Sequence, residues 1–237
     1  MILILKKINL ILKKKNVNLI ITAKYFSYIF KSLKNYLKIL FNNSSDSFYI
    51  PNLAIKNTIY INPSKIRYIN SIPFKFNKST KLILDFDKSN KNLDTFKHQT
   101  YVTCHQLFIE GKKIEQCDNY YFFKKRMENK IKDKDFKNHN DLIEYFKKKK
   151  ELFENIKKRG VKTHSLFNIQ FIIDKNCNLV KINSGNHRFF ISRILKLKLI
   201  PAEIKLIHSN CFVKNKNKKI NIRNLNNFIK NVEDNYR

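Results

Sequence analysis

Glycine and tryptophan are scarce or absent in this sequence. Of its 237 residues, 3 are glycine and none is tryptophan. The glycine-rich phosphate loops of Rossmann and Walker nucleotide-binding sites need several glycines close together, so this composition excludes both. Long apolar runs are also missing. Lysines interrupt the apolar N-terminal segments, and no run reaches the roughly 18–20 residues that span a bilayer. We therefore expect no transmembrane segment.

The four cysteines form no C-x-x-C pair, and the N-terminus does not resemble a secretion signal. These features predict a cytoplasmic, reducing setting in which all four are ordinary thiols. His98, Cys104 and His105 match no zinc-ligand spacing, and we interpret them as structural residues. Asp85 and Asp87 could share one face at a strand end and bind a divalent cation. Without a third ligand a surface turn is favoured, and no metal site is expected.

An excess of positively charged residues is the most conspicuous feature of the composition. The 49 Lys and Arg against 18 Asp and Glu give a formal net charge of +31, yet only seven of the 49 are arginine. Lys, Asn, Ile, Phe and Tyr have A/T-rich codons and are abundant, so an A/T-rich genome would produce this bias without selection for a basic protein. Basic and acidic residues number 9 and 1 in residues 1–50, 22 and 11 in 51–150, 11 and 4 in 151–210, and 7 and 2 in 211–237. This even spread favours a solvated lysine coat, with nucleic acid or an anionic membrane surface as possible partners.

The patterning predicts a folded domain with extensions at both ends. The hydrophobic share of 43% requires a packed core. Residues 1–41 show helical periodicity and residues 42–47 read as a polar linker, so 1–47 is expected to be an amphipathic helical extension. Such a helix either packs on the protein or lies on anionic lipid, and packing is the commoner outcome. Residues 48–210 form the expected domain, and 211–237 is a basic tail with a short helix near 225–232.

Several elements are predicted inside that domain. Asp141 with Glu144 resembles a capping box, and an apolar stripe interrupted at Lys149 leads to Gly160, which predicts an amphipathic helix over 141–159. Two strands joined by the turn 174–178 are expected to form a hairpin, and Pro201 is expected to break the chain before a last strand. The expected strands are 58–61, 81–84, 166–173, 179–182 and 202–207, with a further helix over 187–196.

The polar corner between residues 182 and 188 is the best candidate for a site. Here a strand ends, the chain turns at Gly185, and a helix begins within a few residues. A helix N-terminus favours anions, and glycine lets the backbone approach a ligand closely. Arg188 can bind phosphate in a bidentate manner, and His187 can donate a hydrogen bond or transfer a proton. The alternative is a plain turn in which Asn183 or Ser184 caps the helix.

The segment from Val180 to Arg188, VKINSGNHR, resembles the strand and G-x-H-R corner of the ParB/sulfiredoxin superfamily. The helix that follows it, the sequence Leu199-Ile-Pro201 and the closing strand also match, and so does the upstream helix that ends at Gly160. The resemblance covers about residues 151–208. More weakly, residues 59–68 (IYINPSKIRY) resemble the opening strand and helix of that domain. The resemblance implies an α+β fold, a small mixed sheet with packed helices, carrying a large insertion around residues 70–140.

In that family the corner binds nucleotide phosphates, and the resemblance implies ATP or CTP with Mg²⁺ as the ligand. The binding positions it implies are Ser184, Gly185, Asn186, His187 and Arg188. Sulfiredoxins carry a cysteine where this chain has Asn186, so sulfinic-acid reduction is not expected. The roughly thirty residues after Ile207 are too few for the DNA-binding domain of a partitioning protein. The family also includes free-serine kinases, which bind ATP or ADP at this corner. Their catalytic acids have no clear match here, although Asp174 and Glu203 lie nearby in sequence.

The sequence thus predicts a protein that binds a nucleotide or a phosphorylated small molecule at Ser184–Arg188, with phosphoryl transfer or nucleotide hydrolysis left open. One alternative is a non-specific DNA- or RNA-binding protein, whose lysines would contact phosphates while Tyr and Phe stack on bases. The other is a peripheral membrane protein anchored by residues 1–41.

Overall fold

The structure, a computed structural model, describes residues 49–51, 58–70, 90–129, 136, 138–163, 168–182, 184–211 and 222–237. The chain divides into two compact units, Met1–Asp46 and Ser47–Arg237, and all described residues belong to the second. The expected helical extension, the linker at 42–47, the strand at 81–84 and the Asp85/Asp87 pair lie outside the described residues. Of the helices that the structure describes, none combines the length and apolar character needed to cross a membrane.

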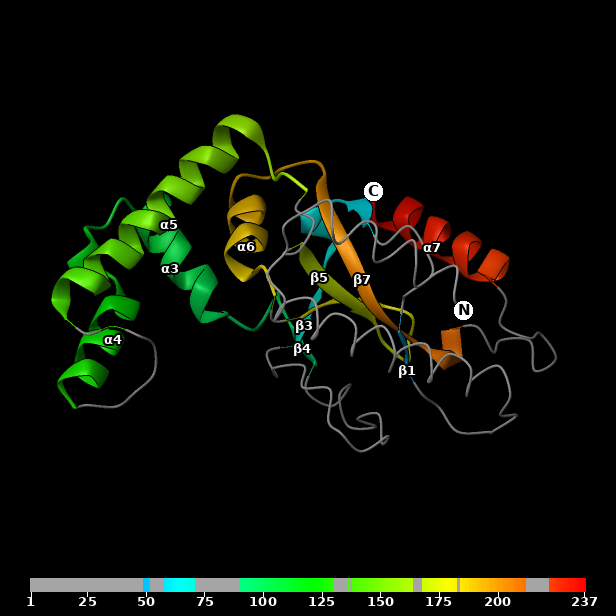
Figure 1. The fold of residues 1–237 in the computed structure, drawn as a ribbon, viewed down its shortest axis with the longest axis horizontal. Coiled ribbons are helices and arrows are strands. Elements are labelled where there is room, and N and C mark those ends of the chain that lie inside the picture. The colour runs from blue at the N-terminus through cyan, green and yellow to red at the C-terminus, as the bar shows by residue number, and fades with distance from the viewer. Residues whose placement is uncertain are drawn as a thin grey trace, which may run out of the picture. The chain divides into compact units, whose positions relative to one another are not determined.

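The described chain is a mixed α/β structure, in agreement with the expected α+β class (Figure 1). The strands are β1 (Tyr49–Pro51), β2 (Thr58–Ile61), β3 (Tyr68–Asn70), β4 (Asn90–Asn92), β5 (Ile169–Ile173), β6 (Leu179–Lys181) and β7 (Ile200–His208). The α-helices are α3 (Gln99–Phe108), α4 (Asp118–Glu128), α5 (His139–Arg159), α6 (Asn186–Ile194) and α7 (Ile222–Tyr236). Short 3-10 turns occupy Pro63–Lys65 (η1), Ile114–Gln116 (η3) and Ser209–Cys211 (η4).

The seven described strands form one mixed sheet in the order β1-β7-β5-β6-β3-β4, with β2 also paired to β7. β7 pairs in parallel with β5, and β1 and β2 run antiparallel along different segments of β7. β5 and β6 form the expected antiparallel hairpin. Contrary to expectation, Pro201 does not break the chain, because it lies inside β7 opposite Tyr60 of β2. The last strand is therefore longer than predicted.

Helix α7 is part of the main core and is longer than the short helix expected in the C-terminal segment. Ile229 and Val232 are buried in the same cluster as the sheet residues and α6. Two donors on the β2 side of the sheet find acceptors on α7: the backbone N–H of Tyr60 donates to Glu233 Oε1 at 2.8 Å, and that of Asn62 to the carbonyl of Tyr236 at 2.7 Å. An exposed strand edge would leave such groups unpaired, so α7 covers this edge.

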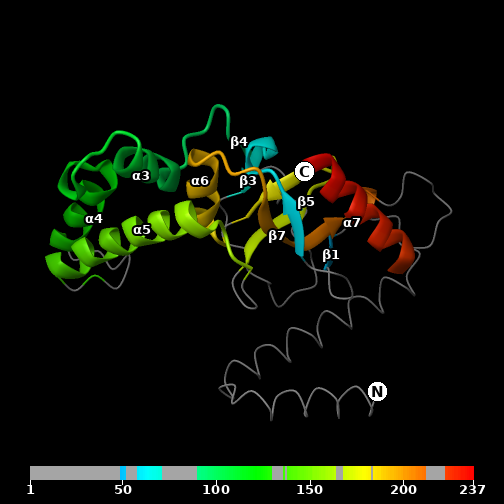
Figure 2. The same ribbon diagram turned by 90° about the horizontal axis from the view of Figure 1, so that it is seen from above.

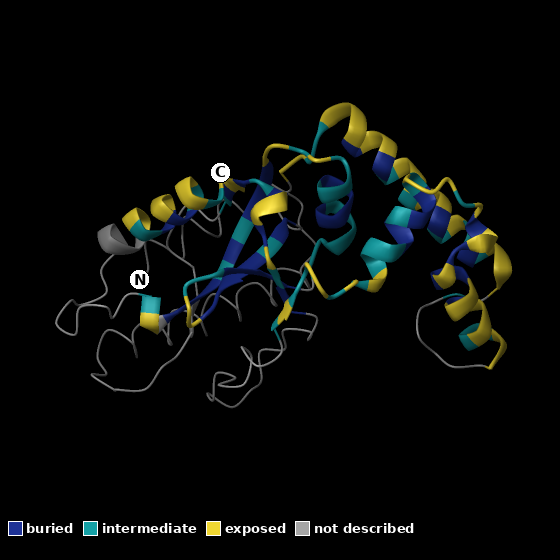
Figure 3. Ribbon diagram, turned by 180° about the vertical axis from the view of Figure 1, so that it is seen from behind, coloured by how far each residue is buried: buried dark blue, intermediate teal, exposed yellow. Residues whose placement is uncertain are grey.

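Helix α5 confirms the predicted amphipathic helix, although it begins earlier than expected. Asn138, not Asp141, is the N-cap, and its side chain accepts a hydrogen bond from the backbone N–H of Asp141 at 2.9 Å. The helix ends at Gly160, whose φ of 66° suits glycine. Buried and exposed residues alternate along α5 with helical periodicity (Figure 3).

Helix α6 connects the sheet to the helices α3, α4 and α5 (Figures 1 and 2). Phe189 and Phe190 on α6 belong to the core against the sheet. Ile191, on another side of the helix, packs with Cys104 of α3 and Phe153 of α5. A third apolar cluster joins α3, α4 and α5 and contains Leu107, Ile114, Cys117, Tyr120, Phe123, Leu142 and Phe146. The start of α6 is thus held between two well-packed regions.

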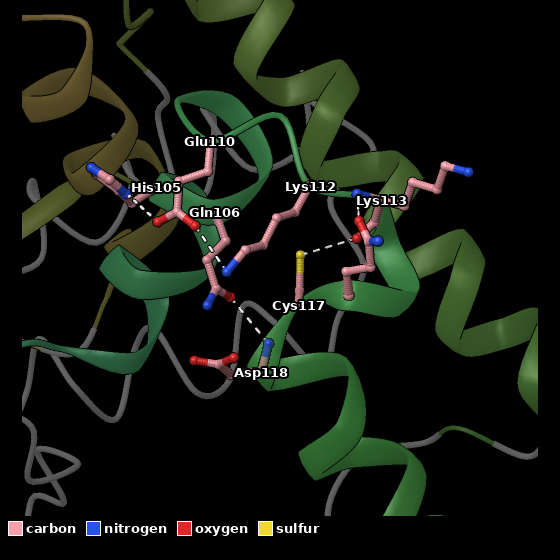
Figure 4. Close-up of polar contacts among 8 residues, drawn as sticks. His105, Gln106, Glu110, Lys112, Lys113, Cys117 and Asp118 are labelled. Atoms are coloured by element: carbon pink, nitrogen blue, oxygen red, sulfur yellow. Dashed lines mark hydrogen bonds and ion pairs between the residues drawn. The ribbon is translucent and has the colours of Figure 1, made fainter.

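Polar contacts hold the connection between α3 and α4 (Figure 4). The backbone N–H of Asp118, at the start of α4, donates to Gln106 Oε1 on α3 at 3.0 Å. Glu110 lies between Lys112 Nζ at 2.9 Å and His105 Nδ1 at 2.8 Å. Hydrogen bonds from Lys112 and then His105 lower the pKa of Glu110. This places His105 in a surface hydrogen bond with Glu110, consistent with a structural role.

The expectation that all four cysteines are thiols is wrong for one pair. Cys177 in the β5–β6 turn and Cys211 in η4 form a disulfide with a Cα–Cα distance of 5.5 Å. Their separation of 34 residues hid the pairing, because no local spacing brings them together. Cys104 and Cys117 are free thiols and are buried.

Candidate functional site

The corner between β6 and α6 requires glycine for two reasons. Gly185 is the N-cap of α6 and has the left-handed conformation φ 79°, ψ 23°. A Cβ atom placed on it would lie 3.0 Å from the Cα of Ile169 and 3.2 Å from its Cγ1. The hairpin brings Ile169 of β5 against the corner, so both the backbone angle and the lack of space favour glycine. The N-cap of α6 is thus Gly185 and not Ser184, whereas Asn183, the other capping residue considered, lies outside the described residues.

A pocket of about 470 Å³ opens in front of this corner. Gly185 to Arg188 form one wall, Lys149 and Leu152 of α5 a second, and His98 and Thr100 at the start of α3 a third. The described residues that line the pocket include two cationic side chains, Lys149 and Arg188, and no carboxylate. Together with the N-terminus of α6, they create a positively charged cavity suited to an anion.

His187 contacts a residue that the sequence did not single out. Its Nε2 lies 3.2 Å from the hydroxyl oxygen of Tyr145 on α5, and the two rings meet edge to face at 6.2 Å. Burial raises the pKa of Tyr145 to about 12, so the phenol keeps its proton near neutral pH. Lys149 Nζ lies 4.6 Å from the centre of the same ring. Tyr145 therefore positions two residues of the pocket wall.

His98 forms part of the third wall as a neutral imidazole. It is the N-cap of α3, and its Nδ1 accepts a hydrogen bond from the backbone N–H of Thr100 at 3.1 Å. Its ring stacks on Phe190 of α6 at 4.9 Å. Burial, followed by the charges of Lys181 and Lys91, lowers the pKa of His98 from 6.5 to about 4.

This pKa predicts a pH-dependent stability that involves His98. Between pH 6.5 and 4 the unfolded chain binds a proton at His98 that the folded chain does not, so the free energy of unfolding falls as the pH is lowered. Above pH 6.5 His98 is neutral in both the folded and the unfolded chain, so this loss of stability is absent there. We expect the wild type to lose about 1–2 kcal/mol more than His98→Asn from pH 7 to 4, after solvent screening is considered. Urea unfolding of both proteins across this pH range measures the difference, and parallel profiles would contradict it.

The control variant is chosen because asparagine is also a good N-cap and does not titrate. It removes the stacking on Phe190, so the variant is expected to be less stable at every pH. The change of the unfolding free energy with pH is therefore the quantity to compare, because the loss of stacking is the same at every pH and proton binding is not.

The five predicted binding residues all lie at the corner, and four further lining residues were missed. Gly185, Asn186, His187 and Arg188 line the pocket, and the carbonyl of Ser184 accepts a hydrogen bond from the backbone N–H of Gln170. The missed lining residues are His98, Thr100, Lys149 and Leu152. The interruption of the apolar stripe of α5 at Lys149 could have indicated the pocket, because a lysine on the inner face of a helix indicates that this position is not packed in an apolar core.

The carboxylates nearest in sequence do not line the pocket. Asp174 is buried and accepts hydrogen bonds from the backbone N–H groups of Asn176 and Asn178 in the β5–β6 turn. Glu203 on β7 pairs with Lys205. Across the described part of the chain, no three His, Cys, Asp or Glu side chains form a group that could hold a metal ion.

Comparison with known proteins identifies no relative: no protein-family model, no curated protein and no solved structure matches this chain.

Proposed function

We propose that this protein binds a nucleotide or another phosphorylated small molecule in the pocket at Ser184–Arg188, in a domain of the ParB/sulfiredoxin-like type. The observation that carries the proposal is the pocket itself. A left-handed glycine, the first turn of a helix and the side chains of Lys149, His187 and Arg188 converge on one cavity with no carboxylate among its described lining residues.

Each feature has a physical reason to select phosphate. The first turn of α6 carries the positive end of the helix dipole, and Gly185 adds no side chain that would keep a ligand away from the backbone. Arg188 can form two parallel hydrogen bonds to phosphate oxygens, and Lys149 can contribute a second charge from α5. Two cationic side chains beside a helix N-terminus favour a ligand that carries negative charge.

The order of the elements supports the family resemblance. β2 and η1 are followed by β3, and α5 ending at Gly160 is followed by the hairpin, the corner, α6 and β7. Helices α3 and α4 fall within the stretch expected as an insertion, and the start of α3 contributes His98 to the pocket. In this proposal the insertion is therefore part of the binding site.

The proposal concerns binding, and we assign no reaction. ATP or CTP would bring Mg²⁺ on its own phosphate oxygens, since the described lining residues offer that metal no carboxylate. Neither Asp174 nor Glu203 lines the cavity, so neither is placed to act as a general base there.

A thermal-shift panel with ATP, CTP, GTP and inorganic pyrophosphate, with and without Mg²⁺, tests the function. A ligand at a hundred times its dissociation constant should stabilise the protein by about 2.7 kcal/mol. Arg188→Ala is expected to weaken that ligand by about tenfold or more, because a charged hydrogen bond contributes roughly 1.5–3 kcal/mol. Arg159→Ala, an exposed arginine at the end of α5, is the matched control for net charge and should bind like the wild type.

Two results would reject the proposal: no shift with any of the four ligands, or equal shifts in the wild type and Arg188→Ala.

Nucleic-acid binding is the second candidate function. Tyr121 and Phe122 on α4 are 60% and 42% exposed, and the same helix carries exposed Lys124 and Lys125. An oligonucleotide arm of the same panel separates the two. Affinity that falls by orders of magnitude from low to physiological salt and is unaffected by Arg188→Ala would favour nucleic acid.

A further inference from the structure

Lys181 is a fully buried cation directly behind the corner. It is the last residue of β6, between the buried Val180 and Ile182, and its side chain has no solvent exposure. Its Nζ donates hydrogen bonds to the carbonyl of Ile182, to the carbonyl of Ser184 at 2.6 Å and to Oδ1 of Asn186 at 2.8 Å. Two of these acceptors precede α6 and the third is its first residue, so one side chain links the end of β6 to the start of α6.

The contacts fit the charged form of the lysine. An ammonium has three N–H donors, and here each has an acceptor. The rings of Phe171 and Phe189 lie 5.9 and 5.8 Å from Nζ, within the range of cation–π attraction. Burial and then the charge of Arg188 lower the pKa of Lys181. Hydrogen bonds to acceptors and aromatic faces, in contrast, favour the charged form of a lysine. The three acceptors are two backbone carbonyls and one side-chain amide oxygen, so all three are uncharged.

The hydrogen bonds also orient the backbone of the corner. The carbonyl of Ser184 points at the ammonium, and in a planar trans peptide the N–H of the next residue points the opposite way. The N–H of Gly185 is therefore directed away from Lys181. Asn186, the first residue of α6, is tied to the same ammonium through its side chain. Lys181 thus links the end of β6 to the start of α6.

Resting on the function proposed above, we propose that Lys181 is a positioning residue of this pocket. Its ammonium holds Ile182, Ser184 and Asn186 in the arrangement that presents Gly185 and the first turn of α6 to a phosphate group. The chemistry recognised is a phosphate group, whether it belongs to a nucleotide or to a smaller phosphate ester.

Lys181→Met tests this role, because methionine retains most of the length and removes the charge and the donors. Two measurements are made on the full chain: calorimetric titration with ATP and inorganic pyrophosphate, and hydrogen exchange of the ligand-free protein. We expect affinity to fall tenfold or more, and the amides of residues 184–188 to exchange faster while those of β7 are unchanged. Lys181→Gln, which keeps two donors, serves for the same comparisons if the methionine variant does not fold.

Val180→Ala is the matched control, since Val180 is the preceding residue of the same strand and is also fully buried. It packs in a separate cluster with Ile172, Ile182 and Leu206. This variant should lower the unfolding midpoint and leave the affinity for pyrophosphate within twofold of the wild type. A loss of affinity merely caused by reduced stability would appear in both variants.

The outcomes separate this role from the function on which it rests. If Lys181→Met binds ATP and pyrophosphate as the wild type does, or if Val180→Ala loses equal affinity, Lys181 is not a positioning residue and the proposed function stands. If the wild type binds neither probe, the proposed function is wrong and the role of Lys181 in it is wrong as well.

Discussion

Gly185→Ala is expected to destabilise the protein by about 2–5 kcal/mol and to abolish ligand binding at the corner. A non-glycine residue in a strained, left-handed conformation costs roughly 1–3 kcal/mol, and an atom forced into a packed site costs a similar amount. Here the new Cβ would lie 3.0 Å from a backbone atom of Ile169, which cannot move without shifting β5. Urea unfolding gives the change in free energy, and the nucleotide panel gives the change in affinity.

Gly111→Ala is the control for the conformational part of this effect. Gly111 also has a positive φ, 65°, but a Cβ placed on it would meet no atom within 4 Å. The variant should therefore lose about 1 kcal/mol from backbone strain alone. The additional loss of unfolding free energy in Gly185→Ala, compared with Gly111→Ala, measures the cost of the contact between the new Cβ and Ile169. Equal losses in the two variants would show that this approach contributes nothing.

Reduction of the Cys177–Cys211 disulfide is expected to lower the free energy of unfolding by about 3–4 kcal/mol. In the chain-entropy model, a cross-link between residues 34 apart restricts the unfolded chain by roughly this amount. The bond ties the β5–β6 turn to the end of β7, so its loss also frees one end of the hairpin that leads to the corner. Urea unfolding with and without a thiol reductant measures the effect.

The double variant Cys177→Ser/Cys211→Ser should have the stability of the reduced protein and no longer respond to reductant. Cys104 and Cys117 are the internal control, since both are buried and burial raises the pKa of Cys104 to about 12. Replacing either with alanine should leave the response to reductant intact. A wild-type protein whose unfolding midpoint is the same in both conditions would contradict a stabilising disulfide.

Local patterns predicted the elements whose signals are short in range. The β-branched runs marked β2 and the β5–β6 hairpin, and the apolar stripe before Gly160 marked α5. Pro201 misled the prediction of β7, because a proline is tolerated where the partner strand does not need its N–H, as at the position opposite Tyr60. The predicted start of α5 lay too far along the chain. Asn138 and Asp141 are both good capping residues, and only the fold selects between them.

The sequence by itself was enough to single out the corner at Gly185 as the candidate site. Its determinants are contiguous: a strand end, Gly185, and His187 and Arg188 on the first helical turn. Only the tertiary structure decided what surrounds that corner. Tyr145 is 42 residues from the histidine it contacts, and Lys149 and His98 are also distant in sequence from the corner they face. The burial of Lys181 and the pairing of Cys177 with Cys211 likewise depend on how β5, β6 and β7 assemble, because no local spacing encodes a long-range contact.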